Sequence, residues 1–223
     1  VVVLAGGRVM TSTGVIYDKA DVVMRGAELV AVGPDVERPT GAEVVDVSGK
    51  TVTPGLIDTH SHIGVYASPG LSAHSDGNEI VGPLTPYVWS ADGYWPQDPQ
   101  IERARAGGVT TMQILPGSAN LIGGRSVTVK TYRDRRSAED ARFVAAPFGL
   151  KMACGENPKR VYGEKGGPST RMGNIAQVRM AFQRAREYQR RWQKYREKLA
   201  KYEAKKKAPP RAKKKEEDDD DDR

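Results

Sequence analysis

The hydrophobic and polar positions of this chain fall into three successive patterns. Residues 1–51 contain short apolar runs separated by glycines, which predicts a small β-rich module. Residues 52–153 contain longer apolar runs that alternate with loops and short helical stretches, a pattern typical of an α/β fold. From residue 174 onward, apolar residues recur in steps of three and four, which predicts one long helix.

The predicted elements of the first two parts are short and closely spaced. Gly6-Gly7 and the later glycines of residues 1–51 are interpreted as turns between five strands. These strands are Val1–Leu4, Arg8–Met10, Asp21–Met24, Leu29–Val32 and Glu43–Val47. The second part is expected to contain strands at 56–62, 109–115, 126–132 and 149–153, helices at 101–106 and 137–145, and loops at 65–100 and 116–124.

One phrase in the second part carries candidate chemistry. The apolar run that begins at Val52 ends in His60-Ser61-His62. Because side chains alternate along a strand, both imidazoles project from one face, with Asp58 just behind them. Imidazole is the commonest protein ligand for a divalent metal, so the pair is a candidate metal site at the end of a strand.

A second candidate lies on the predicted strand at 149–153. Alternation places Leu150, Met152 and Cys154 toward covering helices and Lys151 toward the interior, between two small residues. A buried lysine is costly unless it is paired or modified. Lys151 is therefore either a functional residue or a side chain that extends to the rim of the fold.

The phrase Pro54-Gly55-Leu56-Ile57-Asp58 before the two histidines resembles the first barrel strand of the metal-dependent amidohydrolase superfamily, in particular members like imidazolonepropionase and isoaspartyl dipeptidase. The phrase 104–111 is similar to the second strand of that family. The resemblance covers about residues 1–163. It implies an α/β fold in which a β-sandwich portion (1–53) precedes the N-terminal part (54–173) of a TIM-like (β/α) barrel.

The same resemblance implies a set of functional residues. His60 and His62 would ligate one or two divalent ions, with Zn²⁺ expected, and Lys151 would be carboxylated and bridge two metals. Glu156 is the alternative bridge, and His74 in the long loop is a weaker candidate. The activity implied is hydrolysis of a C–N bond in a cyclic amide, a peptide-like amide or an amidine. The candidate contacts to this small-molecule substrate are Ser118, Asn120, Lys159 and Arg160.

The family pattern also shows what this sequence lacks. In that pattern two further histidines and an aspartate, which acts as general base, come from later strands, whereas no histidine follows Lys151 here. An eight-stranded barrel takes roughly 250 residues, and half a barrel would expose a sheet edge. A second polypeptide is therefore expected to complete the barrel, in a hetero-oligomer of higher order.

Charge and composition change this picture little. The net charge of +7 arises from residue 179 onward, where 17 Lys and Arg stand against 10 Asp and Glu. The helical arm (174–204) is thus basic, and the charged tail (205–223) is expected to be disordered. One alternative function is nucleic-acid binding by the arm, against which the acidic block argues because it can neutralise the basic charge. The other alternative is a catalytically silent assembly subunit. No apolar run is long enough to span a membrane.

The single Cys154 fits a reducing compartment, so a cytoplasmic location is expected. The sequence opens on valines without a methionine, which leaves export through a removed leader as an alternative.

Overall fold

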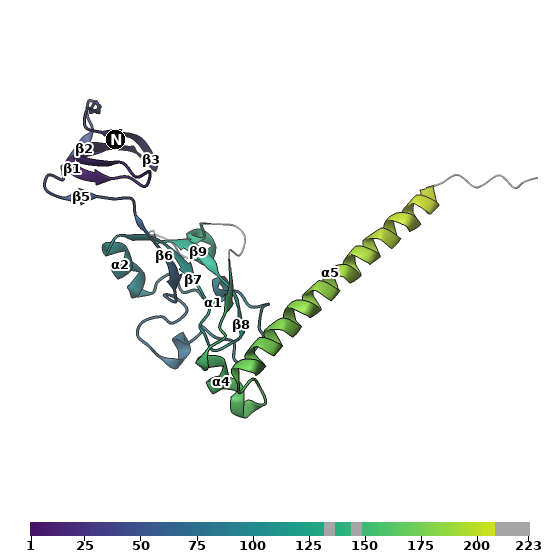
Figure 1. Cartoon of the computed structure of the whole chain (residues 1–223). Coiled ribbons are helices and arrows are strands. Elements are labelled where there is room, and N and C mark those ends of the chain that lie inside the picture. The colour runs from purple at the N-terminus through teal and green to yellow at the C-terminus, as the bar shows by residue number, and fades with distance from the viewer. Residues whose placement is uncertain (132–136, 144–148, 208–223) are drawn as a thin grey trace, which may run out of the picture.

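A computed structural model describes residues 1–131, 137–143 and 149–207 (Figure 1). The N-terminal part forms one five-stranded sheet in the order β3-β2-β1-β4, and β5 also pairs with β1. β1 runs antiparallel to β2 and parallel to β4 and β5. The strands are β1 (Val2–Met10), β2 (Ile16–Arg25), β3 (Glu28–Gly33), β4 (Glu43–Asp46) and β5 (Thr51–Val52).

The expectation of a turn at Gly6-Gly7 is wrong. Both glycines lie inside the single strand β1, and the register with β2 shifts on each side of Gly7. Gly6 has a φ of 75°, a left-handed conformation that glycine adopts without strain. The two glycines therefore form an irregularity that bends a strand rather than ending it.

The following part begins with the strand that carries the histidines, β6 (Leu56–Ser61). β6 pairs in parallel with β7 (Val109–Ile114), as expected for the first two strands of a barrel. The helix between them, α2 (Pro99–Ala106), starts where the Asp98 side chain accepts a hydrogen bond from the Gln100 N–H, and it has Pro at its first position. Figure 1 shows α2 beside the β6 and β7 strands.

The next strands depart from the predicted pattern. β9 (Val127–Lys130) is a strand as expected, but it runs antiparallel to β7. The loop expected at 116–124 is shorter than predicted, because residues from Ile122 onward form β8 (Ile122–Arg125). β8 pairs antiparallel with β10 (Leu150–Met152), the strand that carries Lys151. The described residues thus contain part of a barrel-like arrangement in which only β6 and β7 pair in parallel.

The core of this part lies around β7 and β9. Met112, Ile114, Val127 and Val129 are each at most 1% exposed and pack with Val65 and Tyr94 from the long loop. The β6 side of this sheet is less covered than β7, because β6 is an edge strand in the order β6-β7-β9. The apolar pair Leu56-Ile57 predicts a buried stretch of this strand, but that prediction is wrong, since the two residues are 54% and 68% exposed.

The remaining helices are short, apart from the last one. The helix α4 (Glu156–Tyr162) was not predicted, because Pro158 interrupts its sequence. Proline is tolerated at this position because it lies in the first turn of the helix. The predicted helix at 137–145 is observed over 138–141, and residues 144–145 lie outside the described residues. The short elements are η1 (Ser72–His74), α1 (Ser90–Gly93), α3 (Ala138–Ala141), α4 (Glu156–Tyr162) and η2 (Gly163–Lys165).

The long helix α5 spans Arg171–Lys207 and leaves the rest of the chain as a straight arm (Figure 1). It includes the expected 174–204 and extends into the predicted tail, so residues 205–207 are helical. Residues 208–223 of the tail lie outside the described residues. Among the helices that the structure describes, none is both long and apolar enough to cross a membrane.

Candidate metal centre

The two histidines lie together at the end of β6, as the alternation of side chains predicts. His60 is in the strand and His62 follows it, and their ring centroids are 5.3 Å apart with the planes nearly perpendicular. The carboxylate of Asp58 accepts a hydrogen bond from the backbone N–H of His60 at 3.0 Å. Asp58 thus fixes the backbone that presents the pair.

A backbone carbonyl sets the orientation of the His62 ring. Nδ1 of His62 lies 2.8 Å from the carbonyl oxygen of Leu115, at the end of the neighbouring strand β7. A carbonyl only accepts, so Nδ1 carries the proton and Nε2 keeps its lone pair. This arrangement is typical of metal-ligating histidines, whose second nitrogen donates to a carbonyl or carboxylate.

Lys151 reaches the same place from β10, far along the chain. Its Nζ lies 3.0 Å from Nε2 of His60, so the ammonium donates to the ring nitrogen. The flanking Leu150 and Met152 are 42% and 40% exposed, and Cys154 is also exposed. Lys151 thus lies on the opposite face of the strand from Leu150 and Met152, as alternation predicts. However, none of the described helices covers Leu150, Met152 or Cys154.

The charges of this cluster act on one another. The positive charge of Lys151, then burial and then His62, lower the pKa of His60 below its ordinary value, while Asp58 opposes the shift. Burial lowers the pKa of Lys151. Both shifts favour neutral nitrogens, which are the forms that bind metals or react with electrophiles.

The described residues supply part of a metal site. Among residues 1–131, 137–143 and 149–207, no group of three or more His, Cys, Asp or Glu side chains gathers at one point. His60 and His62 fit a divalent metal because each has a nitrogen available once Lys151 no longer occupies Nε2 of His60. A full ligand set requires donors in addition to these two.

The two weaker candidates lie in other surroundings. Nδ1 of His74 contacts the carbonyl of Pro69 at 2.7 Å, and its ring packs on Trp95 with centroids 5.1 Å apart. Glu156 begins α4 and is exposed. The structure therefore brings Lys151, rather than either of these residues, to the histidine pair.

Ser118 and Asn120 lie in a second cluster, and Asn120 is fully buried. Its side-chain NH₂ donates to the carbonyls of Glu79 and Gly82 and to Oγ1 of Thr85, while its Oδ1 accepts from the hydroxyl of Tyr162. These contacts use its hydrogen-bonding groups internally, so Asn120 has a structural role in this conformation. Ser118 Oγ accepts from Nδ2 of Asn157 at 2.7 Å.

Lys159 and Arg160 lie on α4 near this second cluster. Arg160 donates to Oδ1 of Asn157, the residue that also contacts Ser118, and it is exposed. Lys159 is half-buried. The substrate candidates are thus grouped around α4, and no hydrogen bond among the described residues joins them to His60, His62 or Lys151.

An aromatic ring adjoins His62, and a hollow opens between the loops that follow the two parallel strands. The ring of Tyr66 lies edge-on to His62 at 5.9 Å between centroids, and its hydroxyl contacts Asn78. A hollow of about 560 Å³ opens nearby, lined by both long loops, including Val65, Asp76, Asn78, Glu79, Tyr87, Trp89, Asp92 and Pro116. The sequence could not identify Leu115 or Tyr66 as neighbours of His62, because their roles depend on strand pairing and loop closure.

Comparison with known proteins places this geometry in context. The chain is 43% identical over 167 residues to the amidohydrolase TasK of Hapsidospora irregularis, a match that covers 71% of this chain and 17% of that protein. It is 48% identical over 65 residues to an imidazolonepropionase of Geobacillus kaustophilus, which covers 26% of this chain and 15% of that one. No family profile matches the chain.

A solved structure matches almost the whole chain. The crystal structure of an amidohydrolase from Thermotoga maritima superimposes with a TM-score of 0.79 and 41% identity, over 95% of this chain and 53% of that chain. The unmatched remainder of this chain is much smaller than the 37 residues of α5, so the match includes most of that helix. The chain spans about half the length of this solved relative.

Proposed function

Because this chain belongs to the amidohydrolase superfamily, we propose that it supplies the N-terminal part of the active site of a metal-dependent hydrolase that cleaves C–N bonds. The substrate class is a cyclic amide, a peptide-like amide or an amidine. The single observation that carries the proposal is the meeting of His60, His62 and Lys151 at one strand end. These residues come from two strands and lie up to 91 positions apart in the sequence.

His60 and His62 would hold a divalent ion, with Zn²⁺ the first choice for imidazole ligands. When bound, such an ion lowers the pKa of a water and polarises the scissile carbonyl. Leu115 keeps Nε2 of His62 free for ligation by accepting the Nδ1 proton. Asp58 holds the backbone of His60 in place.

Lys151 is proposed to act as a carboxylated side chain. In the described state its ammonium donates to Nε2 of His60 and thus occupies the lone pair that a metal needs. Reaction of the neutral amine with CO₂ forms an N–C bond and releases one proton, which turns this donor into an anionic acceptor. The burial that lowers the pKa of Lys151 favours the neutral amine, and carboxylation removes the competition for His60.

The hollow between the two long loops is the proposed place for the substrate; His60, His62 and Lys151 are not part of its lining, which reaches His62 through Val65. It lies between the loops 65–100 and 116–124, and its lining includes Asp76, Glu79 and Asp92 together with Tyr87 and Trp89. Ser118, Lys159 and Arg160 lie near the second of these loops and stay candidates for substrate contacts. Asn120 would contribute by holding this loop in place, since its amide joins it to residues 79–85.

A second polypeptide is proposed to supply the remaining ligands and the general-base aspartate. The open edge of β6, the exposed Leu56 and Ile57, and the exposed Val30 and Val44 of the N-terminal sheet support this proposal. Such apolar surfaces on sheets are aggregation hazards unless another segment covers them. Size analysis under native conditions should find this chain together with a polypeptide of comparable or greater length. Purification of the chain alone as an active, metal-loaded monomer would refute it.

The metal assignment can be tested with a matched histidine control. His60→Ala combined with His62→Ala should remove bound Zn²⁺ from the native assembly and abolish hydrolysis, whereas His74→Ala should keep both, because His74 packs on Trp95. Elemental analysis gives the metal content per chain. Full occupancy in the double variant contradicts the assignment, and metal without hydrolysis in the unaltered assembly indicates a silent subunit.

The role of Lys151 has its own test. Lys151→Glu should retain more activity than Lys151→Ala, because glutamate restores an anionic oxygen ligand. The mass of the metal-loaded chain should exceed the sequence mass by one CO₂, and the Lys151→Ala variant should lack this increase. A free amine at full metal loading would rule out the carboxylated form.

A further inference from the structure

The helix α5 carries a continuous apolar seam that nothing in the described structure covers. Val178 of the seam is half-buried, whereas its other large side chains are between 39% (Leu199) and 64% (Tyr202) exposed, with Trp192 at 44%. Asn174, near its start, is the only buried residue of this helix. The seam consists of Ile175, Val178, Phe182, Ala185, Tyr188, Trp192, Tyr195, Leu199 and Tyr202.

The spacing of the seam is that of a coiled coil. From Ile175 to Ala185 and from Tyr188 to Tyr202 the steps alternate between three and four residues, with one three-residue step joining the two sections. Such a narrow stripe fits one facing helix rather than a sheet or a broad groove. Trp192 packs edge-on with Tyr188 and Tyr195, at 6.2 and 5.6 Å between centroids, so the rings form one ridge along the helix.

The charges beside the seam select the partner. The 37 residues of α5 contain 13 Lys and Arg against 3 Glu. In a heptad arrangement the positions that flank the seam pair with charges on the facing helix. Most of these flanking positions are basic: Arg179, Arg186, Arg191, Arg196, Lys198 and Lys205.

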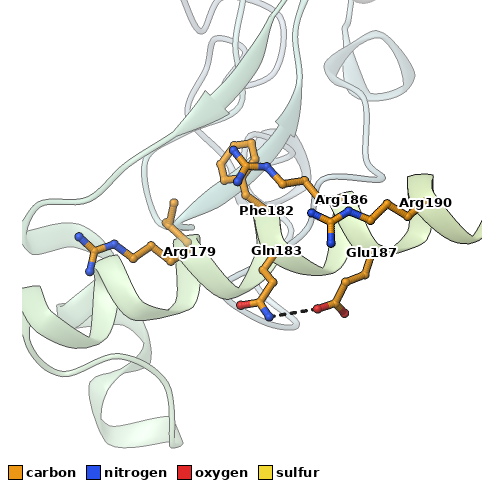
Figure 2. A pocket seen from close by; sticks show the side chains of 7 residues that line it. Arg179, Phe182, Gln183, Arg186, Glu187 and Arg190 are labelled. Carbon is orange, nitrogen blue, oxygen red and sulfur yellow. Dashed lines mark hydrogen bonds between the residues drawn. The ribbon is translucent and has the colours of Figure 1, made fainter.

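These basic side chains have no carboxylate partner in the structure. Within the described ranges, no ion pair involves a residue of α5, and Glu187 and Glu197 instead accept hydrogen bonds from Gln183 and Gln193. Figure 2 shows Phe182 and Arg186 projecting from one side of the helix, where they line an open hollow of about 570 Å³. Arg191 stacks on the Tyr188 ring, but the flanking guanidinium groups have no carboxylate partner among the described residues, so the ridge is complementary to an apolar stripe bordered by carboxylates.

We propose that α5 docks an acidic amphipathic helix of the polypeptide that completes the barrel, forming a two-helix coiled coil along the seam. The inference rests on the proposed function for the existence of that polypeptide. A helix of 37 residues extends about 55 Å, and polar faces alone do not stabilise so long an isolated helix. The match to the Thermotoga structure includes most of α5, so the arm is shared with a relative.

Other occupants fit less well. A second copy of this chain would bring basic flanks against basic flanks, which is unfavourable. The acidic block 216–222 contains only Glu and Asp, so it could neutralise charge but could not cover aromatic rings. A nucleic acid would match the charge, but it would leave most of the regular seam uncovered.

The proposal can be tested on the whole 223-residue chain with synthetic helical peptides of about four heptads. One peptide has a leucine seam and glutamate flanks, the second has lysine flanks, and the third has an alanine seam with glutamate flanks. Binding is followed by the blue shift of Trp192 emission, and Trp192→Phe should remove this shift. We expect the first peptide to bind at least about tenfold more tightly than the other two.

A charge-reversed chain is the matched control. The variant Arg186→Glu with Arg191→Glu should keep its helicity by circular dichroism and should shift its preference toward the lysine-flanked peptide. Equal binding of all peptides, or no binding, overturns the proposal. The proposal is also overturned if heparin binds in a salt-sensitive way, still binds the Trp192→Ala variant and excludes the acidic peptide. Self-association of the chain that the acidic peptide does not compete with overturns it as well.

These outcomes are independent of the metal site. Loss of Zn²⁺ binding in the His60→Ala and His62→Ala variant leaves peptide binding unchanged if the inference holds. Failure of peptide binding in a chain that still assembles and binds Zn²⁺ counts against the seam alone.

Discussion

The region around β7 and the helix α5 both contain regular apolar patterns, but they bury them to different extents. Met112 and Ile114 of β7 are fully buried, because β6, β9 and the long loop pack on that strand. Phe182 and Trp192 of α5 are 46% and 44% exposed. A periodic apolar pattern therefore predicts that a surface will be covered, but not that the same chain covers it.

The comparison also separates two kinds of stability. Burial of the β7 side chains contributes directly to folding of the chain, at about 25 cal/mol for each Å² removed from water. The seam of α5 contributes little until a partner arrives, so substitutions there should affect assembly rather than folding. The following expectations test that division, starting from the largest effect.

Met112→Ala should destabilise the chain by about 2–5 kcal/mol, because it leaves a cavity in a packed core. Met112 is fully buried, and its sulfur lies 3.9 Å from the hydroxyl of Ser61, next to both histidines. Urea unfolding followed by far-UV circular dichroism measures the change. A loss below 1 kcal/mol would mean that the region around β7 is no better packed than the arm.

Asn120→Ala should cost about 1–3 kcal/mol, because it leaves the buried hydroxyl of Tyr162 and two carbonyls without their partner. Asn157→Ala is the control, since that side chain is only half-buried and contacts Ser118 and Arg160. Unfolding free energies of the two variants should differ by about 1 kcal/mol or more. Equal values would argue that Asn120 is not a structural centre of the loops.

Asp21→Asn should remove an acid-dependent part of the stability of the N-terminal sheet. The Arg38 guanidinium, at 2.6 Å, together with the Gly6 N–H lowers the pKa of Asp21 below 3.8, although burial opposes this. The stabilisation by this carboxylate is fully present above the pKa that Asp21 has in the unfolded chain. It is lost as the pH falls through the lower pKa that Asp21 has in the folded chain. Unfolding at pH 7 and pH 3 should show a smaller difference for the variant; equal differences would exclude this linkage.

Met180→Ala in α5 should change the unfolding free energy by at most about 0.5 kcal/mol, because Met180 is partly exposed and alanine favours helix at least as well. The same chemical change as in Met112→Ala thus compares the packed core with the arm, at a position beside the seam. A loss similar to that of Met112→Ala would show that the arm is already covered in the isolated chain.

The sequence predicted the geometry of the candidate metal site where that geometry depends on one strand or on simple alternation. The shared face of His60 and His62 and the direction of Lys151 follow from side-chain alternation, and the parallel neighbour β7 follows from the family resemblance. The long helix follows from its apolar steps. Zinc as the metal, carboxylation of Lys151 and a second polypeptide stay predictions.

Other features depend on contacts that no local pattern contains. β8 was predicted as a loop because two of its four residues are glycines, and its partner β10 lies far along the chain. The exposure of Leu56 and Ile57 reflects the open edge of β6, whereas their sequence is that of a buried strand. The buried role of Asn120 also depends on four partners from distant segments.

The contacts that fix His62 have a consequence for the order in which the protein is made. Asp98, only 2% exposed, accepts from the Gly64 N–H across 34 residues, and His62 contacts Leu115 across 53. The sequence separation of each of these contacts is modest. N-terminal segments also emerge first during translation. The contacts that orient the His62 ring therefore involve only residues up to Leu115, so they can form before Lys151 and α5 emerge from the ribosome.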